Sequence, residues 1–289
     1  MIFTKKCFET SCPPAFNLGL TLDCGQAFRW TEKDGKWHGV AFSKPLTVYQ
    51  TENKIIFDCD EDDFNKIWKK YFDFECDYEE ITSKYDDKYL SQAVKDYNGI
   101  RILRQEPWEA LCSFIISANN NIPQIKGIVD RLCETFGEGK EGQKSFPSAE
   151  KLSTLTVEDL ASLRSGFRAK YIIDAAQKVA NGTVDFDAIE KNPIEFGREE
   201  LQKINGVGAK VAECTLLYGF HKIEAFPIDV WVRRIMAEMY PNWLPECTKG
   251  TEGIAQQYLF HWRRMQDKNS KRLTRASFWF FLLLLLHAR

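Results

Sequence analysis

Short segments in the first third of the chain alternate between apolar and polar residues, which is typical of half-buried strands. Two pairs of such segments, 28–31 with 36–40 and 46–49 with 54–57, predict two hairpins. An Asp-Gly pair at 34–35 joins the first two segments, and this pair favours a tight hairpin turn. The beginning of the chain is therefore expected to be an antiparallel sheet.

Helical spacing replaces this alternation from about residue 90 onward. Residues 108–116 are mostly apolar. Further along, apolar residues recur every three or four positions and fall on one helix face: Ile125, Ile128, Val129, Leu132 and Phe136. Ser148 and Thr156 are placed to cap the first turns of later helices. Helices are expected to dominate the rest of the chain.

The two patterns predict an α+β protein in two parts, an N-terminal antiparallel β domain over residues 1–87 and a mostly α-helical domain over 88–268. Residues 269–289 form an atypical tail, basic at first and then apolar. Its apolar run, 278–286, is too short for a bilayer span of roughly 20 residues. A disrupted reading frame is our first explanation of the tail and a membrane-touching anchor the second, while its basic residues alone would add affinity for phosphate.

The composition is that of a globular protein without a uniform charge. Of the 289 residues, 44% are hydrophobic and 28% charged, and the formal net charge is −2. Twelve acids and five lysines in the stretch 58–88 give it a charge of −7, so the remainder of the chain carries +5. Any polyanionic partner must therefore be bound locally. The acidic stretch itself is expected to be a solvated helix-loop junction between the two parts.

The cysteines and the first residues of the chain bear on its compartment. The nine cysteines are odd in number and include no Cys-x-x-Cys pair. They therefore predict neither a disulfide framework nor a zinc or iron–sulfur site. The first residues lack the apolar run of a signal peptide. We expect reduced thiols in a cytoplasmic protein.

Gly206 and Gly208 break a helical pattern that restarts at once. Glycines at this spacing permit a tight turn between two helices, and the free N–H groups at the start of the second helix can bind phosphate without a lysine cluster. A simple turn between helices explains the same two glycines. The nearby residues favour a functional site over a simple turn, because Lys210 follows in the first turn of the second helix and Asp229 lies 19 residues later.

Lys210 and Asp229 are the candidate catalytic pair. The amine of Lys210, next to the positive end of a helix dipole, is placed to act as a nucleophile. A carboxylate at Asp229 can stabilise positive charge that develops on a substrate sugar, or assist proton transfer. A surface salt bridge is the alternative for an isolated pair of this kind.

The segments that contain this pair, 206–214 and 226–230, resemble the helix-hairpin-helix and Gly/Pro…Asp signature of base-excision DNA glycosylases. The specific resemblance is to the 8-oxoguanine DNA glycosylase/AP lyase family, whose spacing of lysine to aspartate is the same. Further matches occur in the same order along the chain, at 24–30, 117–122, 166–171 and 255–260. The resemblance thus extends over most of the chain.

The resemblance implies a bifunctional enzyme of base excision repair that acts on damaged double-stranded DNA. Such an enzyme takes its target nucleotide out of the base stack and holds it in a pocket. Lys210 would attack C1′, expel 8-oxoguanine and form a Schiff base, through which β-elimination nicks the strand. Asp229 would support the developing positive charge. No metal, cofactor or membrane is implied, and a prokaryotic, nucleoid-associated monomer is expected.

By the same resemblance, four residues form the base-recognition pocket: Gly25, Cys214, Gln256 and Phe260. The backbone carbonyl of Gly25 would accept the N7–H that 8-oxoguanine has and guanine lacks. Gln256 would bond to the base edge, and Phe260 and Cys214 would sandwich the ring. The alternatives are a plain turn at Gly25 and ordinary core positions for Phe260 and Cys214.

Other residues are implied to contact DNA outside the pocket. The implied contacts to the opposite base and the wedge are Asn119, Gln124, Phe167 and Arg168, and those to the DNA backbone are Asn120, Gly206, Gly208 and Val211. A helix C-cap with left-handed backbone is the alternative for the asparagines. Relatives that require cytosine opposite the lesion carry Arg and Tyr at Gln124 and Phe167, so a relaxed opposite-base preference is implied. Trp231 stands where some relatives have a phosphate-contacting His, which puts that contact in doubt.

Two rival functions follow from the same motifs. A monofunctional alkylpurine-type DNA glycosylase would share the hairpin and the aspartate but would not use Lys210. A non-catalytic helix-hairpin-helix DNA-binding protein would need the two glycines but not Lys210, Asp229 or Gln256, and the presence of all three argues against it. The iron–sulfur members of the superfamily need four C-terminal cysteines, which this chain lacks.

Overall fold

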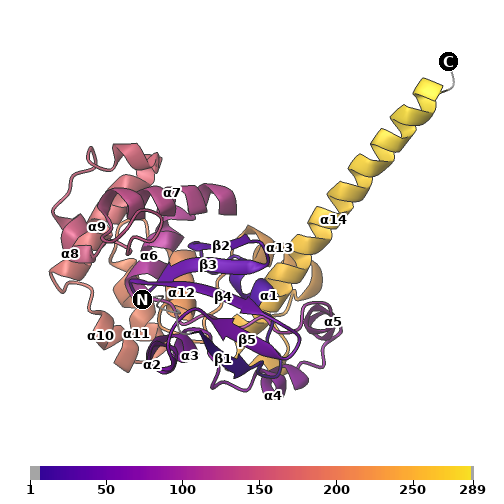
Figure 1. Cartoon of the computed structure of the whole chain (residues 1–289), viewed down its shortest axis with the longest axis horizontal. Coiled ribbons are helices and arrows are strands. Elements are labelled where there is room, and N and C mark those ends of the chain that lie inside the picture. Colours follow the sequence, from indigo (N-terminus) through magenta and orange to yellow (C-terminus); the bar gives the residue numbers. More distant parts are fainter. Residues whose placement is uncertain (1–6, 288–289) are drawn as a thin grey trace, which may run out of the picture.

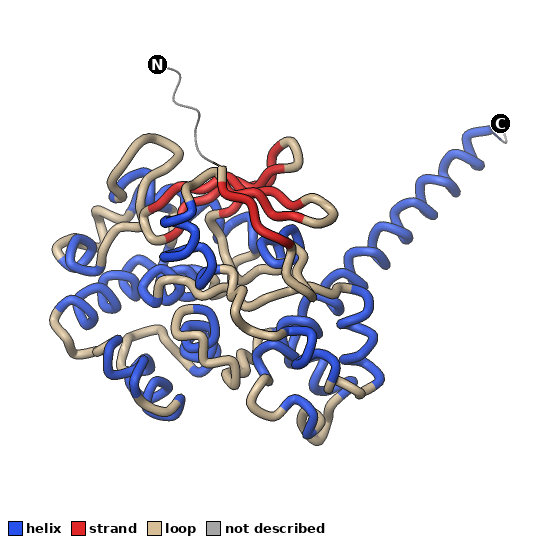
Figure 2. The backbone as a smooth tube through the Cα atoms, turned by 60° about the horizontal axis from the view of Figure 1, so that its bottom comes forward, coloured by secondary structure: helices blue, strands red, loops and turns tan. Residues whose placement is uncertain are grey.

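The chain forms one antiparallel sheet with a larger body of helices to one side of it (Figure 1, Figure 2). The structure is a computed structural model, and it describes the backbone of residues 7–287 and the side chains of residues 7–270. The strands are β1 (Phe8–Ser11), β2 (Trp30–Lys33), β3 (Lys36–Ala41), β4 (Lys44–Gln50) and β5 (Lys54–Phe57). Their order across the sheet is β1-β5-β4-β3-β2.

Helices make up most of the remaining chain and confirm the α+β fold. In chain order they are α1 (Leu18–Asp23), α2 (Glu61–Asp63), η1 (Phe64–Trp68), α3 (Lys69–Tyr71), α4 (Tyr78–Ser83), α5 (Lys88–Asp96), α6 (Pro107–Ile116), α7 (Ile122–Phe136), α8 (Ala149–Ser153), η2 (Ala161–Leu163), η3 (Gly166–Arg168), α9 (Ala169–Ala180), α10 (Phe186–Lys191), α11 (Ile194–Gln202), α12 (Ala209–Tyr218), α13 (Val230–Met239), η4 (Glu246–Thr248) and α14 (Glu252–His287). The predicted domain boundary at residue 87 stays a prediction.

Both predicted hairpins are present, and the sheet adds features that the alternation does not reveal. Asp34 and Gly35 form the β2–β3 turn with φ values of 53° and 73°. The β3–β4 turn also has positive φ, but it uses Phe42 and Ser43 without glycine or asparagine. β1 pairs with β5, with Phe8 opposite Phe57, and neither predicted hairpin includes it.

The predictions of two helix caps have different outcomes. Ser148 caps α8, because its hydroxyl accepts from the backbone N–H of Lys151 at 3.2 Å. The prediction for Thr156 is wrong. Its backbone N–H and its hydroxyl both donate to Asp159, at 2.8 and 2.9 Å, but the chain forms only a turn there and no α-helix begins. A capping-box pattern thus also serves a turn that leads only into a short 3-10 helix, η2.

An aromatic core lies under the sheet and includes residues of the acidic stretch 58–88. Trp30 is 1% exposed, and its ring lies about 6 Å from those of Trp68 and Tyr71. Its indole N–H donates to the Tyr71 hydroxyl at 2.7 Å. The expectation of a merely solvated junction is therefore incomplete, because Trp68 and Tyr71 come from this stretch while Glu61 and Asp62 face solvent.

The second core belongs to the helical body. The apolar face predicted over 125–136 is buried in α7. Two residues from the N-terminal part of the chain, Cys24 and Phe28, belong to the same cluster. All nine cysteines are free thiols. Among the described residues, no group of three His, Cys, Asp or Glu side chains is placed to hold a metal ion.

The last helix, α14, is 36 residues long and leaves the body of the molecule (Figure 1). Its first turns are buried, with Ile254, Tyr258 and Leu259 in the helical core. The predicted tail does not form a separate segment as far as residue 287, because 269–287 continue the helix, and 288–289 lie outside the described residues. Over the described part of the chain, no helix combines the length and the apolar character needed to cross a bilayer.

Candidate active site

A cavity of about 1010 Å³ lies where α6, α12, α13 and α14 approach the loop after α1. Nine predicted site residues line it: Gly25, Asn119, Asn120, Lys210, Val211, Cys214, Asp229, Gln256 and Phe260. Five others do not line it: Gln124, Phe167, Arg168, Gly206 and Gly208. The fold thus gathers the predicted catalytic and base-recognition residues at one cavity.

Lys210 is held at the cavity wall by a serine. Its Nζ donates to Ser117 Oγ at 2.9 Å and lies 5.0 Å from the centroid of the Phe114 ring. The Ser117 hydroxyl itself donates to the Phe114 carbonyl at 2.7 Å, so a lone pair of Oγ is presented to the amine. Within the described chain Lys210 forms no ion pair, which removes the surface salt bridge as its explanation.

Asp229 is the N-cap residue of α13, and this role fixes its carboxylate. Oδ1 accepts from the backbone N–H of Val232 at 2.8 Å. Oδ2 is bonded to no described residue, and Asp229 lines the cavity. The preceding loop is held by Glu213, which accepts from the Phe226 N–H at 2.7 Å and pairs with Arg198. One carboxylate oxygen is therefore committed to the fold and the other faces the cavity.

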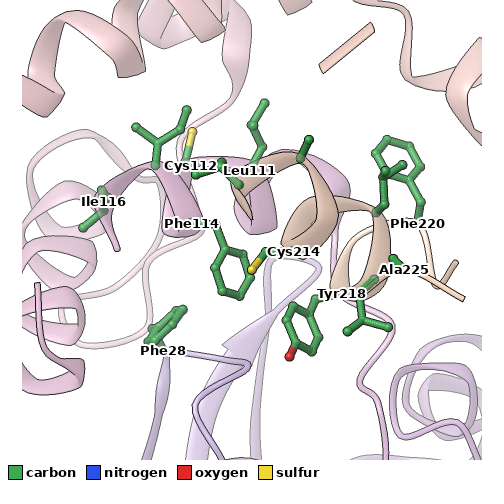
Figure 3. Close-up of a cluster of buried hydrophobic side chains, with 14 of the residues drawn as sticks. Phe28, Leu111, Cys112, Phe114, Ile116, Cys214, Tyr218, Phe220 and Ala225 are labelled. Carbon is green, nitrogen blue, oxygen red and sulfur yellow. The ribbon is translucent and has the colours of Figure 1, made fainter. Parts of the chain in front are cut away.

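The floor of the cavity is apolar and comes from three segments (Figure 3). Phe114 and Tyr218 stack with ring centroids 5.1 Å apart, and Phe28 meets the edge of Phe114. Cys214 lies beside them in Figure 3. Burial raises the pKa of the Cys214 thiol to about 11, so the thiol is uncharged near neutral pH despite Lys210 nearby. The floor can therefore take the flat face of an aromatic ligand.

Gly25 both turns the chain and lines the cavity. Its φ is +92°, a backbone conformation that residues other than glycine rarely adopt. A Cβ there would lie 3.1 Å from Ile122 Cδ1 and 3.5 Å from Phe260 Cε1. A plain turn is therefore an incomplete account of Gly25, because any side chain would enter the space against Phe260.

The loop around Gly25 is tied down on both sides. The carbonyl of Cys24 accepts from Gln257 Nε2 at 3.1 Å. The Gln26 side chain is fully buried and donates to the carbonyls of Thr21 and Arg101, at 2.9 and 2.7 Å. These bonds hold the Gly25 backbone in one position.

Gln256 presents an unpaired acceptor to the cavity. The residue is 4% exposed, and its Oε1 has no hydrogen-bond partner in the described chain. Phe260 lies one turn later on α14 and is half-buried. Because an unpaired buried acceptor costs free energy, the position favours a ligand with a donor at its edge.

The asparagines at the end of α6 serve as caps. Asn119 has a left-handed backbone with φ of 55° and is exposed. Asn120 Nδ2 donates to the Ile116 carbonyl at 2.8 Å. Asn121 caps α7 reciprocally with Gln124, whose Oε1 accepts from the Asn121 N–H at 2.9 Å. The capping alternative is therefore present in the structure, and the predicted DNA contacts of Asn119 and Gln124 stay predictions.

Arg168 braces this turn while its neighbour is exposed. The Arg168 guanidinium donates to the carbonyls of Ala118 and Ser165, the latter at 3.1 Å. Phe167 is 49% exposed, with the guanidinium 4.5 Å from its ring centroid. Arg168 thus fixes the backbone next to Asn119, and about half of the Phe167 side chain is exposed to solvent.

The helical hairpin between α11 and α12 has the predicted glycines at its turn. Gly206 has φ of +82°, and a Cβ there would lie 2.4 Å from the Tyr171 ring. A Cβ on Gly208, the N-cap of α12, would meet no atom within 4 Å. Gly208 and Ala209 are both exposed, so the start of α12 is open to solvent, as an anion site requires.

Four cavity or supporting residues were not singled out by the motifs: Ser117, Tyr218, Gln257 and Arg264. Ser117 is the first residue of a family-like segment, and Tyr218 and Arg264 lie at helical spacing from Cys214 and Phe260. Helical periodicity extended from the motif residues would have found the last two.

Two protein-family models cover most of the chain. The model for the N-terminal domain of 8-oxoguanine DNA glycosylase matches residues 10–111. The model for the HhH-GPD superfamily of base excision DNA repair proteins matches residues 112–258. The second match alone spans half of the chain.

Similar proteins carry related names. An N-glycosylase/DNA lyase of Saccharomyces cerevisiae is 35% identical in an alignment of 260 residues, which covers 77% of this chain and 68% of that protein. The structure of MBOgg1 with a low affinity DNA ligand has a TM-score of 0.85 and 38% identity, covering 90% of this chain and 96% of that one.

A second solved structure is the 8-oxoguanine glycosylase/lyase of Clostridium acetobutylicum with double-stranded DNA containing cytosine opposite 8-oxoG. Its TM-score is 0.82 with 36% identity, over 88% of this chain and 93% of that one. The chain therefore belongs to the 8-oxoguanine DNA glycosylase family, within the HhH-GPD superfamily of base excision DNA repair proteins.

Proposed function

We propose that this protein is a bifunctional DNA glycosylase/AP lyase, which excises 8-oxoguanine from duplex DNA and then nicks the strand by β-elimination. The observation that carries the proposal is that Lys210 and Asp229 share one cavity with Gly25, Gln256 and Phe260. The names of the yeast and clostridial relatives support it. The activity belongs to base excision repair.

Recognition begins when the target nucleotide leaves the base stack and enters the cavity. The Gly25 carbonyl accepts N7–H of 8-oxoguanine, whereas guanine would present an acceptor there. Gln256 Oε1 accepts from the opposite edge of the base, and Phe260 and Cys214 cover its faces. One mismatched buried hydrogen bond gives roughly 10- to 100-fold discrimination.

Excision follows by attack of the Lys210 amine on C1′. The Nζ–C1′ bond forms as the C1′–N9 bond breaks, and the base leaves with the electron pair and takes up a proton. Asp229 Oδ2 faces the positive charge that develops on the sugar. The nitrogen then loses one proton, and the C1′–O4′ bond opens as O4′ leaves with the electron pair and takes up a proton, so that a protonated imine forms. Removal of a proton from C2′ expels the 3′-phosphate and nicks the strand.

The remaining predicted residues act on the duplex around the extruded base. The first N–H groups of α12, behind Gly206 and Gly208, bind a phosphate, with Val211 and Asn120 beside the backbone. Phe167 enters the stack, braced by Arg168, and Asn119 faces the orphaned base. The Gln124 amide is short, uncharged and engaged in the α7 cap, which supports a relaxed preference for the opposite base.

The protein is expected to act as a monomer in a prokaryotic cytoplasm, close to the nucleoid. Its nine free thiols are what a reducing compartment maintains. Light scattering behind a sizing column tests the monomer.

Borohydride trapping tests the proposed function. The protein is mixed with a duplex that contains one 8-oxoguanine opposite each of the four bases in turn, and the covalent adduct is measured for wild type and Lys210→Gln. An adduct that is absent in Lys210→Gln and similar in amount across the four duplexes is expected. DNA binding without any wild-type adduct would contradict the lysine mechanism and favour a monofunctional glycosylase.

A further inference from the structure

Arg264 is a cation of the cavity that the steps above do not use. It lies on α14 one turn beyond Phe260 and two turns beyond Gln256, so the three residues share one helix face. All three line the cavity. The Arg264 guanidinium carbon lies 5.9 Å from the centroid of the Phe260 ring. The face that carries the base-recognition residues therefore continues into Arg264.

One nitrogen of this guanidinium is buried without a partner. Nη1 is inaccessible to solvent and is bonded to no described residue. It lies 3.4 Å from the point that a Cβ on Gly25 would occupy. A buried N–H of a charged group is costly when it has no acceptor. An acceptor on a ligand next to Gly25 would remove this cost.

Arg263, the preceding residue of α14, differs from Arg264 because it forms an ion pair. Arg263 Nη2 donates to Glu238 of α13 at 2.6 Å. Arg264 forms no such ion pair with the part of the chain that the structure describes. The charge of Arg263 is thus explained by the fold, and that of Arg264 is not.

The acceptor that fits is a carbonyl oxygen of the extruded base. On 8-oxoguanine the N7–H donor is flanked by two oxygen acceptors, O6 and O8. A wall with a carbonyl at Gly25 and an N–H beside it matches a donor with an adjacent acceptor. We propose that Arg264 donates from Nη1 to a carbonyl oxygen that flanks N7–H of the extruded base. This inference rests on the proposed excision of 8-oxoguanine.

The Gly25 carbonyl and Arg264 Nη1 recognise different atoms of the base. Unmodified guanine also offers an oxygen at O6, so it satisfies Arg264 but sets its N7 lone pair against the Gly25 carbonyl. Arg264 therefore adds binding to any purine with a carbonyl on this edge, and Gly25 rejects those without N7–H. The ligand class is a purine lesion with N–H and C=O side by side on the Hoogsteen edge.

Single-turnover excision by the full chain tests the proposal on two substrates. One duplex contains 8-oxoguanine, and the other contains a preformed abasic site, which has no base to read. Arg264→Met keeps the length of the side chain and removes the donors, and it is expected to slow the release of 8-oxoguanine by about 10- to 100-fold. Its borohydride trapping on the abasic duplex is expected to stay within about twofold of wild type.

Arg263→Met is the matched control and is expected to stay near wild type on both duplexes. Arg264→Lys keeps the positive charge and one donor nitrogen, and its rate is expected to fall between those of wild type and Arg264→Met. It replaces Arg264→Met in the test if thermal unfolding shows that Arg264→Met does not fold. Wild-type excision by folded Arg264→Met would overturn the proposal. Equal losses on both duplexes would overturn it as well, because they assign Arg264 to the phosphate backbone. Absence of any wild-type adduct on either duplex would overturn the proposed function itself.

Discussion

The core under the sheet and the cavity differ in how completely they satisfy their own polar groups. Under the sheet, the indole N–H of Trp30 is bonded to Tyr71 and the rings contact one another. In the cavity, Gln256 Oε1 and Arg264 Nη1 are buried without partners. Among the described residues, every such atom belongs to residue 165 or a later one. The core under the sheet satisfies its own polar groups, whereas the cavity leaves one buried acceptor and one buried donor unpaired, as a binding site for a polar ligand would.

The largest expected effect separates stability from activity. Trp30→Ala removes a fully buried ring and is expected to lower the free energy of unfolding by about 3–5 kcal/mol, as measured by urea denaturation. The excision rate per folded molecule should be unchanged, because Trp30 lies outside the cavity. Trp30→Phe is the milder variant if the first does not fold. A tenfold fall in rate for either folded variant would show that the two regions are coupled.

Gly25→Ala is expected to have the opposite effect, with a large loss of activity and a small loss of stability. A Cβ would enter the space against Ile122 and Phe260, so excision of 8-oxoguanine is expected to fall about 100-fold while unfolding becomes easier by only about 1–2 kcal/mol. Gly35→Ala is the matched control, because Gly35 has φ of +73° with no atom within 4 Å of its Cβ position. It should lose similar stability and no activity. Equal rates for the two variants would remove Gly25 from recognition.

His261 makes the stability of the cavity side depend on pH. Burial, and then the charge of Arg264, lowers its pKa from 6.5 to about 4, and Tyr97, Asp23 and Lys268 are its other polar neighbours. The unfolded chain binds the proton more readily, so this contribution is present above pH 6.5 and is lost as the pH falls toward 4. The loss is expected to reach about 2–3 kcal/mol. Unfolding curves of His261→Leu should be flatter than wild type over this range, and identical slopes would contradict the assignment.

Ser117 tests whether the cavity wall positions the nucleophile. Ser117→Ala removes the acceptor of Lys210 Nζ, so the rate of adduct formation is expected to fall about tenfold with little change in KM. Ser117→Thr keeps the hydroxyl and should restore most of the rate. Failure of Thr to restore it, with both variants equally stable, would indicate that Ser117 serves only the end of α6.

The smallest effect concerns the projecting part of α14. Changing Lys271, Arg272 and Arg275 to Gln is expected to weaken DNA binding by less than about tenfold and to reduce its salt dependence by about one to three phosphate contacts. Excision from saturated enzyme should not change. Binding measured over a series of salt concentrations checks this, and an unchanged slope would show that these residues do not contact DNA.

The sequence predicts the elements whose signals are local. The Asp34-Gly35 turn and the buried face of α7 are read directly from spacing. β1 is missed because its partner β5 lies far along the chain, and the Phe42-Ser43 turn because its residues are not typical of positive φ. The composition of 269–289 does not predict that α14 continues to residue 287, because its run of five leucines has no helical periodicity.

The same limit applies to the site. Motifs single out Lys210, Asp229, Gly25 and Gln256, because a recognisable local pattern surrounds each of them. Ser117 holds Lys210 from 93 residues away, and Gln257 holds the carbonyl of Cys24 from 233 residues away. Such partners are chosen by the fold, which no local pattern contains. Their roles can therefore be identified only from the three-dimensional structure.

Two adjacent glutamines of α14 have different tasks. Gln256 lines the cavity, whereas Gln257 bonds to the backbone carbonyl that precedes Gly25. Successive side chains leave a helix about 100° apart, so a small rotation of α14 about its axis changes both contacts at once. The placement of Gln256 in the cavity and the support of the Gly25 loop thus both depend on the orientation of α14. We expect substitutions in the distant turns of α14 to change which lesions are accepted, without changing a residue that lines the cavity.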